Sequence, residues 1–221
     1  MDLAERYKSV IEWFETNMPL AVSELSYESP FQLLVAVILS AQCTDKRVNL
    51  VTKELFKKYP SPESLASATP EEVFRYISSV TYPNSKSKHL VNMSKMIVER
   101  FDSKVPSDPL LLQELPGVGR KTANVVASIV YGKPVIAVDT HVFRISRRLG
   151  LSKSKTPYGV EQDLSANIPE DKRAIAHHWL ILHGRYICVA RNPKCSVCGL
   201  REWCLHYHVQ GSTDLHISST D

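Results

Sequence analysis

Apolar residues recur every three or four positions along most of this 221-residue chain, which is the period of an amphipathic α-helix. Strand-like alternation is rare, and only the run 135–138 could pass for a short strand by itself. The pattern predicts a first helix that begins near residue 3 and ends before Pro19, a helix over about 31–41, a third that begins near 45, and two short helices that begin near 62 and 70. Further helices are predicted over about 86–101, 110–115, 120–131, 139–149, 160–166 and 170–185. The chain is therefore expected to be all-α.

Several of these helices carry recognisable start and stop signals. Ser29-Pro30, Ser61-Pro62 and Thr69-Pro70 each resemble an N-cap followed by proline at the first helical position. Thr44 or Asp45 can cap the next helix in the same way, and Gly150 is placed as a C-terminal stop. Residues 80–84 are expected to form a loop.

A tight turn, Pro116-Gly117-Val118-Gly119, separates two of the predicted helices. Its glycines allow positive φ and a close approach of another backbone. Such a hairpin directs the N–H groups of residues 117–120, including that of Arg120, outward at a helix N-terminus, where they favour an anion such as a nucleic-acid phosphate. The alternative is a turn that merely joins two core helices.

Composition describes an ordinary globular protein, with 43% hydrophobic and 23% charged residues. The net charge of +4 permits a polyanionic partner without demanding one. The longest apolar run, residues 31–39, is far shorter than the roughly 20 residues of a membrane span, and no signal peptide pattern opens the chain. We expect a cytoplasmic protein without a membrane partner.

Four of the five cysteines, Cys188, Cys195, Cys198 and Cys204, follow the spacing C-x6-C-x2-C-x5-C. Four thiols so close together indicate a metal centre, and thiolate chemistry alone allows tetrahedral zinc or a [4Fe–4S] cluster. Arg191 and Lys194 lie in the six-residue gap. They are suited to phosphate contacts if the metal pins the loop, or they form a solvated basic turn. Cys43 is expected to be a half-buried residue outside the cluster.

Residues 115–124, with Lys121 directly after the hairpin, resemble the helix-hairpin-helix of the DNA glycosylase superfamily that includes endonuclease III. The resemblance implies that Lys121 is the nucleophile. It also implies that Asp139, eighteen residues later, is the catalytic carboxylate, although Asp139 equally fits the N-cap of the next helix. The cysteine spacing is similar to the cluster loop of these enzymes, which favours [4Fe–4S] over zinc.

The same resemblance implies an activity on double-stranded DNA that carries a damaged base or an abasic site. The damaged base, expected to be an oxidised pyrimidine, is flipped out, Lys121 forms a Schiff base, and the strand breaks 3′ to the lesion by β-elimination. Gln42, in Ser40-Ala41-Gln42, matches a glutamine that fills the hole left in the duplex. Similar enzymes usually carry a Gly-x-Tyr-Asn pattern in this loop, with an apolar side chain at x that acts as a wedge in the duplex. Here Thr81 replaces the glycine and Pro83 replaces the tyrosine, so we assign no role to Tyr82, which stands at x.

The implied architecture is two helical domains that flank a DNA-binding cleft. One is a six-helix domain over 22–134, with the hairpin unit at 108–131. The other joins 1–21 to 135–207 and contains the cluster loop 188–204, and 208–221 form a loose tail. A monomer is expected, associated with the nucleoid if the source is bacterial.

Two other functions compete with this interpretation. A monofunctional adenine or mismatch glycosylase of the same superfamily would share the fold, but such relatives typically lack a lysine at the position of Lys121. A non-catalytic DNA-binding or redox-sensing iron–sulfur protein would keep the hairpin and the cluster without needing both Lys121 and Asp139.

Overall fold

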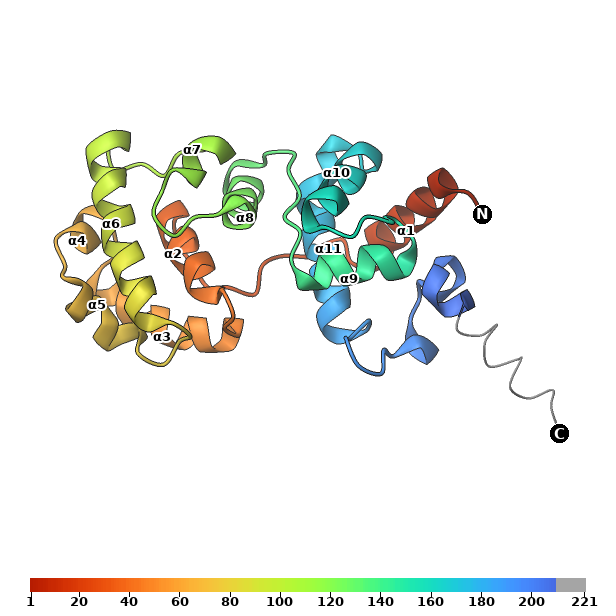
Figure 1. Cartoon of the computed structure of the whole chain (residues 1–221), viewed down its shortest axis with the longest axis horizontal. Coiled ribbons are helices and arrows are strands. Elements are labelled where there is room, and N and C mark those ends of the chain that lie inside the picture. The colour runs from red at the N-terminus through yellow and green to blue at the C-terminus, as the bar shows by residue number, and fades with distance from the viewer. Residues whose placement is uncertain (210–221) are drawn as a thin grey trace. The chain divides into compact units, whose positions relative to one another are not determined.

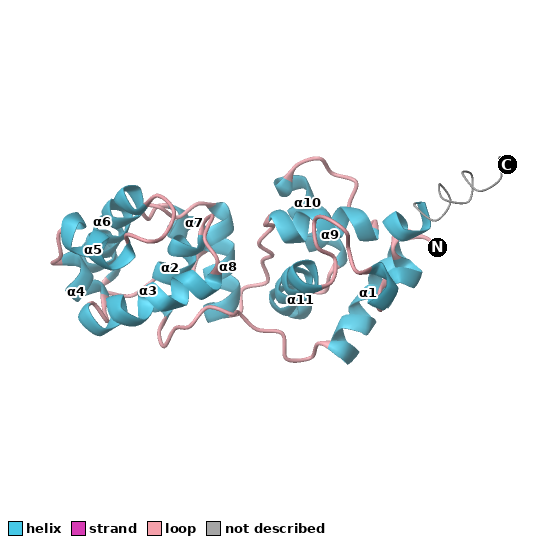
Figure 2. Cartoon of the chain, turned by 90° about the horizontal axis from the view of Figure 1, so that it is seen from below, coloured by secondary structure: helices cyan, strands magenta, loops and turns pink. Residues whose placement is uncertain are grey.

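The computed structural model describes residues 1–209, and these contain helices but no β-strand (Figures 1 and 2). The α-helices are α1 (Leu3–Asn17), α2 (Pro30–Ser40), α3 (Asp45–Lys58), α4 (Pro62–Ala66), α5 (Pro70–Ile77), α6 (Pro83–Phe101), α7 (Pro109–Gln113), α8 (Arg120–Tyr131), α9 (Thr140–Leu149), α10 (Pro157–Asn167) and α11 (Arg173–Tyr186). Short 3-10 turns cover Glu170–Lys172, Cys195–Val197 and Arg201–Trp203. The all-α prediction is confirmed.

The predicted start signals act as helix caps. The side chains of Ser29, Ser61 and Thr69 each accept a hydrogen bond from a backbone N–H in the first turn, and proline follows each of them. Thr44, rather than Asp45, caps α3. Gly150 ends α9 with a φ of +85°, as predicted.

Two expectations need correction, whereas the apolar run 135–138 is an irregular link without strand structure. Helix α6 begins at Pro83, so the end of the predicted loop 80–84 is helical, because proline is well suited to the first position of a helix. Residues 205–209 are helical, with the N–H of His208 bonded to the carbonyl of Cys204, so the predicted loose tail does not begin at 208. The rest of that tail lies outside the described residues.

The chain divides into two compact units. One is Ser23–Lys133, and the other joins Met1–Val22 to the segment that starts at Pro134. The sequence predicts the corresponding limits at 22 and 134. The middle unit holds seven α-helices, α2 to α8, and not the predicted six, because α4 and α7 are separate helices of only five residues each.

Helix α2 is the centre of the middle unit. Every residue from 31 to 39 is buried, and α3, α6 and α8 pack against the helix (Figure 1). A helix that is apolar on all sides must be enclosed in this way. Within residues 1–209, no helix is both long enough and apolar enough to span a membrane.

The other unit has its own apolar core, built from both ends of the chain. Phe14 of α1 stacks on Trp179 of α11, with 5.6 Å between ring centroids. Val142, Ile145 and Leu149 line the inner face of α9, which packs against α11. The N-terminal helix therefore completes a core to which residues more than 120 positions later contribute.

Gly150 offers a test of this packing. A Cβ at this position would lie 2.7 Å from Nη1 of Arg6, whereas a Cβ at Gly132, which also has a positive φ, would meet nothing within 4 Å. We expect Gly132→Ala to lower the free energy of unfolding by about 1–2 kcal/mol, the cost of a left-handed residue with a side chain. Gly150→Ala should cost clearly more, measured by denaturant unfolding of both variants. Equal losses of unfolding free energy in the two variants would show that the Arg6 side chain moves aside without cost.

Candidate functional site

The hairpin is built from α7, a turn with exposed glycines and α8. Leu115 and Val118 anchor the turn in the core, and the N–H of Val118 bonds to the carbonyl of Leu115 at 3.0 Å. Gly117 has a φ of +82°, and a Cβ there would lie 2.9 Å from Cβ of His89. Both constraints require glycine at this position. Gly119 is different, since its φ is −90° and the space around it is open.

The N-terminus of α8 has no side-chain cap, because the N-cap residue is Gly119. Arg120 and Lys121 follow in the first turn, and both are exposed. The positive end of the helix dipole and two cationic side chains therefore occur together at this end of α8. This combination favours a polyanion, and it presents the Lys121 amine to whatever binds there.

Asp139 caps α9 in the other unit. Its Oδ1 accepts a hydrogen bond of 2.8 Å from the N–H of Val142, and the residue is half-buried. The buried link before it is held by His177, whose Nδ1 lies 2.9 Å from the carbonyl oxygen of Ala137. The cap fixes the orientation of the carboxylate. Lys121 and Asp139 thus each have a defined place within their own unit.

Gln42 follows the C-terminal end of α2 and is exposed, with a left-handed φ of 56°. Tyr82, the N-cap residue of α6, has a φ of 55° and is 61% exposed. The Thr81 hydroxyl donates a hydrogen bond of 2.7 Å to the carbonyl of Gln42, which joins the two turns. Lys86 also reaches this turn, and the helical pattern of the sequence gives no signal for either contact.

The four cysteines of the cluster loop are half-buried and form no disulfide with one another or with Cys43, which is half-buried as predicted. Cys188, Cys198 and Cys204 pack against the apolar core of their unit. Burial raises the pKa of the Cys198 thiol, and the neighbouring charges of Cys204, Cys188 and Cys195 raise it further.

The four thiols are the ligand type of either a zinc ion or an iron–sulfur cluster. Among residues 1–209, no three Cys, His, Asp or Glu side chains come together as the ligands of one metal ion would. A zinc ion would bind all four sulfurs at about 2.3 Å from one centre. An iron–sulfur cluster would bind them on different iron atoms.

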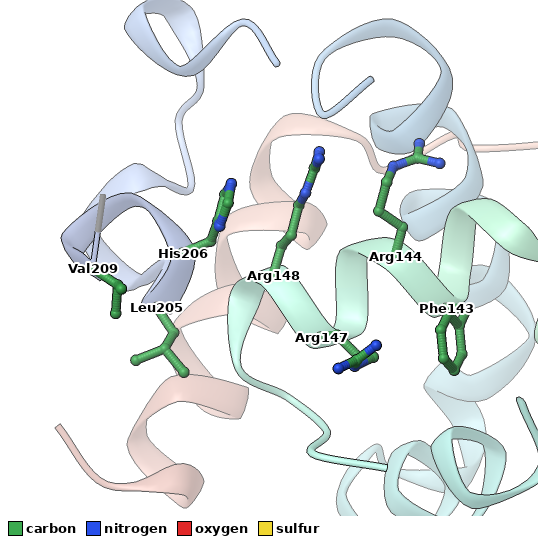
Figure 3. A pocket seen from close by; sticks show the side chains of 7 residues that line it. All are labelled: Phe143, Arg144, Arg147, Arg148, Leu205, His206 and Val209. Carbon is green, nitrogen blue, oxygen red and sulfur yellow. The ribbon is translucent and has the colours of Figure 1, made fainter. Parts of the chain in front are cut away.

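Two arginines of α9 hold the cluster loop (Figure 3). Arg144 donates to the carbonyls of Gly184 and Cys188, at 2.8 and 3.1 Å. Arg148 donates to the carbonyls of Val189 and Ala190, at 2.8 and 2.9 Å. Figure 3 shows both side chains extending from the same side of the helix. Sequence reasoning missed them, because the only signal is a basic face on α9.

His183 is a further neighbour of the cysteines. It is 3% exposed, stands edge-on to Phe14, and its Nε2 lies 3.5 Å from Sγ of Cys198. Burial lowers its pKa to about 4, so the ring is neutral at physiological pH. A neutral imidazole can share one proton with a sulfur atom without adding charge to the buried loop.

Arg191 and Lys194 are both exposed on the loop that Arg148 holds. The N–H of Lys194 also bonds to the carbonyl of Ile187 at 3.0 Å. The loop backbone is therefore fixed on both sides of the two cations, which makes them suitable for contacts with phosphates.

Family models match the two regions described above. Residues 35–170 match the HhH-GPD superfamily of base excision DNA repair proteins. Residues 188–204 match the iron-sulfur binding domain of endonuclease III, which supports the predicted [4Fe–4S] cofactor.

Curated relatives match over nearly the whole chain. The endonuclease III of Rickettsia conorii is 48% identical over 204 residues, which cover 92% of this chain and 97% of the relative. That of Bacillus subtilis is 48% identical, covering 84% of this chain and 85% of the relative. The enzyme of Escherichia coli is 41% identical, with 92% and 96% covered.

Solved structures agree with these matches. A trapped covalent intermediate of endonuclease III with DNA has a TM-score of 0.90 at 40% identity and covers 96% of this chain and 100% of that one. A thermostable thymine-DNA glycosylase, at 21% identity and a TM-score of 0.84, shares the fold, with 93% and 98% covered. The predicted family, fold class and enzyme class are confirmed. The chain belongs to the endonuclease III family of base-excision DNA glycosylases with AP lyase activity.

Proposed function

We propose that this enzyme removes oxidised pyrimidines from double-stranded DNA and then cleaves the strand 3′ to the abasic site. The observation that carries the proposal is the exposed amine of Lys121 in the first turn of α8, directly after the hairpin. A lysine so placed can reach a sugar whose phosphates bind at the same helix end. The family resemblance supplies the class of damaged base. We further propose that the protein acts as a monomer, in the cytoplasm and at the nucleoid of a bacterial host.

The chemistry proposed for Lys121 is nucleophilic. Its neutral amine attacks C1′ of the deoxyribose, and the base departs with the electrons of the glycosidic bond. The C1′–O4′ bond of this adduct then breaks, with the proton lost by the amine balanced by the proton that O4′ gains, and the sugar ring opens to a Schiff base. The Schiff base makes the C2′ proton acidic. Loss of that proton forms the C2′–C3′ double bond and expels the 3′ phosphate, which breaks the strand.

Asp139 is proposed to assist this attack and to stabilise the positive charge that develops on the sugar. Its Oδ1 is engaged by Val142, and within the described chain its Oδ2 has no hydrogen-bond partner. One oxygen therefore fixes the carboxylate while the other stays available to substrate. The N-cap and catalytic roles are compatible for this reason.

Lys121 and Asp139 can be tested together. Lys121→Gln should abolish the adduct that borohydride traps on a duplex with one abasic site, while Lys133→Gln, which removes an exposed cation from the other end of the hairpin helix, should keep it. Asp139→Asn should slow excision of thymine glycol at least about a hundredfold without lowering stability, because asparagine caps a helix as well as aspartate does. If the Lys121→Gln variant still forms the trapped adduct at full yield, Lys121 is not the nucleophile. Unchanged excision by Asp139→Asn would leave Asp139 as a cap only.

The hairpin residues Gly117, Val118, Gly119 and Arg120 are proposed to bind the DNA backbone. Gly119 has open space around it and an ordinary φ, so nothing in the protein itself excludes a side chain there. A phosphate that approaches the start of α8 would account for glycine at this position.

Two substitutions separate folding from binding in the hairpin. Gly119→Ser should leave the unfolding free energy unchanged and weaken DNA binding about tenfold, the worth of one charge-assisted hydrogen bond. Gly117→Ala should instead lower the unfolding free energy by more than the about 1–2 kcal/mol that a left-handed residue with a side chain costs, because φ is +82° and His89 is also in the way. Denaturant unfolding and fluorescence anisotropy with a labelled duplex measure the two effects. Normal DNA affinity of Gly119→Ser would contradict the proposed contact.

Cys188, Cys195, Cys198 and Cys204 are proposed as the ligands of the [4Fe–4S] cluster. When bound, the cluster supplies a structural tie that closes the loop 188–204. Its four ligands leave no position for substrate, so the chain's own residues do the chemistry. Arg191 and Lys194 on this loop are proposed to contact DNA phosphates, as their exposure and the hydrogen bonds of Arg148 support.

Iron content tests the ligand set. Cys198→Ser should lower the iron bound per protein and the visible absorbance of the cluster, since the serine hydroxyl does not ionise at neutral pH as a thiol ligand does. Cys43→Ser is the matched control, because Cys43 is equally half-buried but lies in the other unit. Equal iron content in both variants would exclude Cys198 as a ligand.

A further inference from the structure

Two exposed turns of the middle unit share an unusual backbone conformation. Gln42 and Tyr82 have φ values of 56° and 55°, in the left-handed region that glycine normally occupies. A side chain makes this conformation unfavourable, so it persists only where neighbouring contacts impose it. The contact that joins these turns is the hydrogen bond of 2.7 Å from the Thr81 hydroxyl to the carbonyl of Gln42.

Lys86 fixes the same turn from inside. The residue is only 5% exposed, and its Nζ donates to the carbonyls of Leu39 and Ala41, at 2.8 and 2.7 Å. These carbonyls lie at the C-terminal end of α2, where the negative end of the helix dipole favours a cation. No carboxylate of the described chain forms an ion pair with Lys86, so the buried ammonium is held by the backbone that leads into Gln42. Burial lowers the pKa of Lys86, which agrees with this enclosed position.

We infer that Thr81 and Lys86 are positioning residues that hold Gln42 rigid before DNA binds. The inference rests on the role that we propose for Gln42 from the family resemblance, which is to fill the space left by the extruded nucleotide. A filling side chain on a mobile turn would lose conformational freedom each time it entered the duplex. Thr81 and Lys86 remove that loss in advance, since Thr81 bonds to the carbonyl of Gln42 and Lys86 bonds to the carbonyl of Ala41, the residue before it.

A positioning role for Thr81 and Lys86 predicts that their effect on the excision rate depends on the base opposite the lesion, and a purely structural role does not. Gln42 can substitute for the extruded nucleotide only where an intact partner base faces the hole. Loosening its turn should therefore slow excision of a paired lesion, and it should have little effect where the opposite position carries no base. General destabilisation of the protein would reduce both rates equally.

The experiment measures single-turnover excision of thymine glycol opposite adenine and opposite a tetrahydrofuran residue. Thr81→Val, which keeps the shape and removes the hydroxyl, should slow the paired reaction roughly fivefold, the worth of one neutral hydrogen bond, and leave the unpaired reaction nearly unchanged. Thr81→Ser should restore the wild-type rate ratio. Lys86→Met should lower the paired rate more than tenfold, whereas Lys95→Met, which removes an exposed cation from the same helix, should not.

Gln42→Ala and the double variant Gln42→Ala/Thr81→Val separate this inference from the proposed function. Non-additivity is expected, because Thr81 acts through Gln42 and the double variant should be no slower than Gln42→Ala alone. An unchanged rate ratio in Gln42→Ala would overturn the proposed role of Gln42 itself. If Gln42→Ala changes the rate ratio but Thr81→Val does not, only the positioning role is overturned. Additive effects in the double variant would lead to the same conclusion. Thr81 is half-buried and valine has the same shape, so Thr81→Val is expected to fold. The test therefore does not depend on whether Lys86→Met folds.

Discussion

Helix ends are the constraint on which this structure depends. A chain of many short helices exposes many backbone N–H and C=O groups that no intrahelical bond satisfies, and each buried one needs a partner. Serine, threonine or aspartate supplies the partner at most helix starts, and Lys86, Arg144 and Arg148 supply it to carbonyls at the end of α2 and after α11. Gln42, Lys121 and Asp139 occur at such ends, because these are the places where the backbone still has hydrogen-bonding groups to offer or must be held by side chains.

The start of α8 and the start of α9 solve the same problem in opposite ways. At α9, Asp139 caps the helix and places a negative charge on the positive end of the dipole. At α8, Gly119 provides no side-chain cap, and the exposed Lys121 adds positive charge to an end that is already positive. The helix dipole and the lysine together favour an anion at this end. The uncapped end is therefore suited to an anionic ligand, whereas the capped end holds a fixed carboxylate.

The local features of this structure could be predicted from the sequence, and the long-range ones could not. Ser29, Ser61, Thr69 and Gly150 act through neighbours within a few residues, so their pattern is visible in the chain itself. The resemblance to a known family supplied the cofactor and the enzyme class, which the residues alone left open between zinc and an iron–sulfur cluster. The bond from Thr81 to Gln42 spans 39 positions and that from Arg144 to Cys188 spans 44. Such contacts depend on how helices pack, and helical periodicity predicts only which face of a helix is buried. The roles of individual site residues remain proposals for the same reason.

The discontinuous unit shows what the cluster loop contributes to the fold. Arg6 of α1 donates to the carbonyls of Trp203 and Gly150, at 3.1 and 3.3 Å. Trp13 of the same helix packs so closely on Gly199 that a Cβ there would lie 2.6 Å from Cε2 of the indole. The first helix of the chain is therefore fastened to the loop that carries the last three cysteines. A tie within residues 188–204 restricts that loop in the unfolded chain and keeps in place the surface against which α1 packs. The middle unit is continuous, with its core centred on α2, so a cluster in the other unit contributes no comparable restraint there.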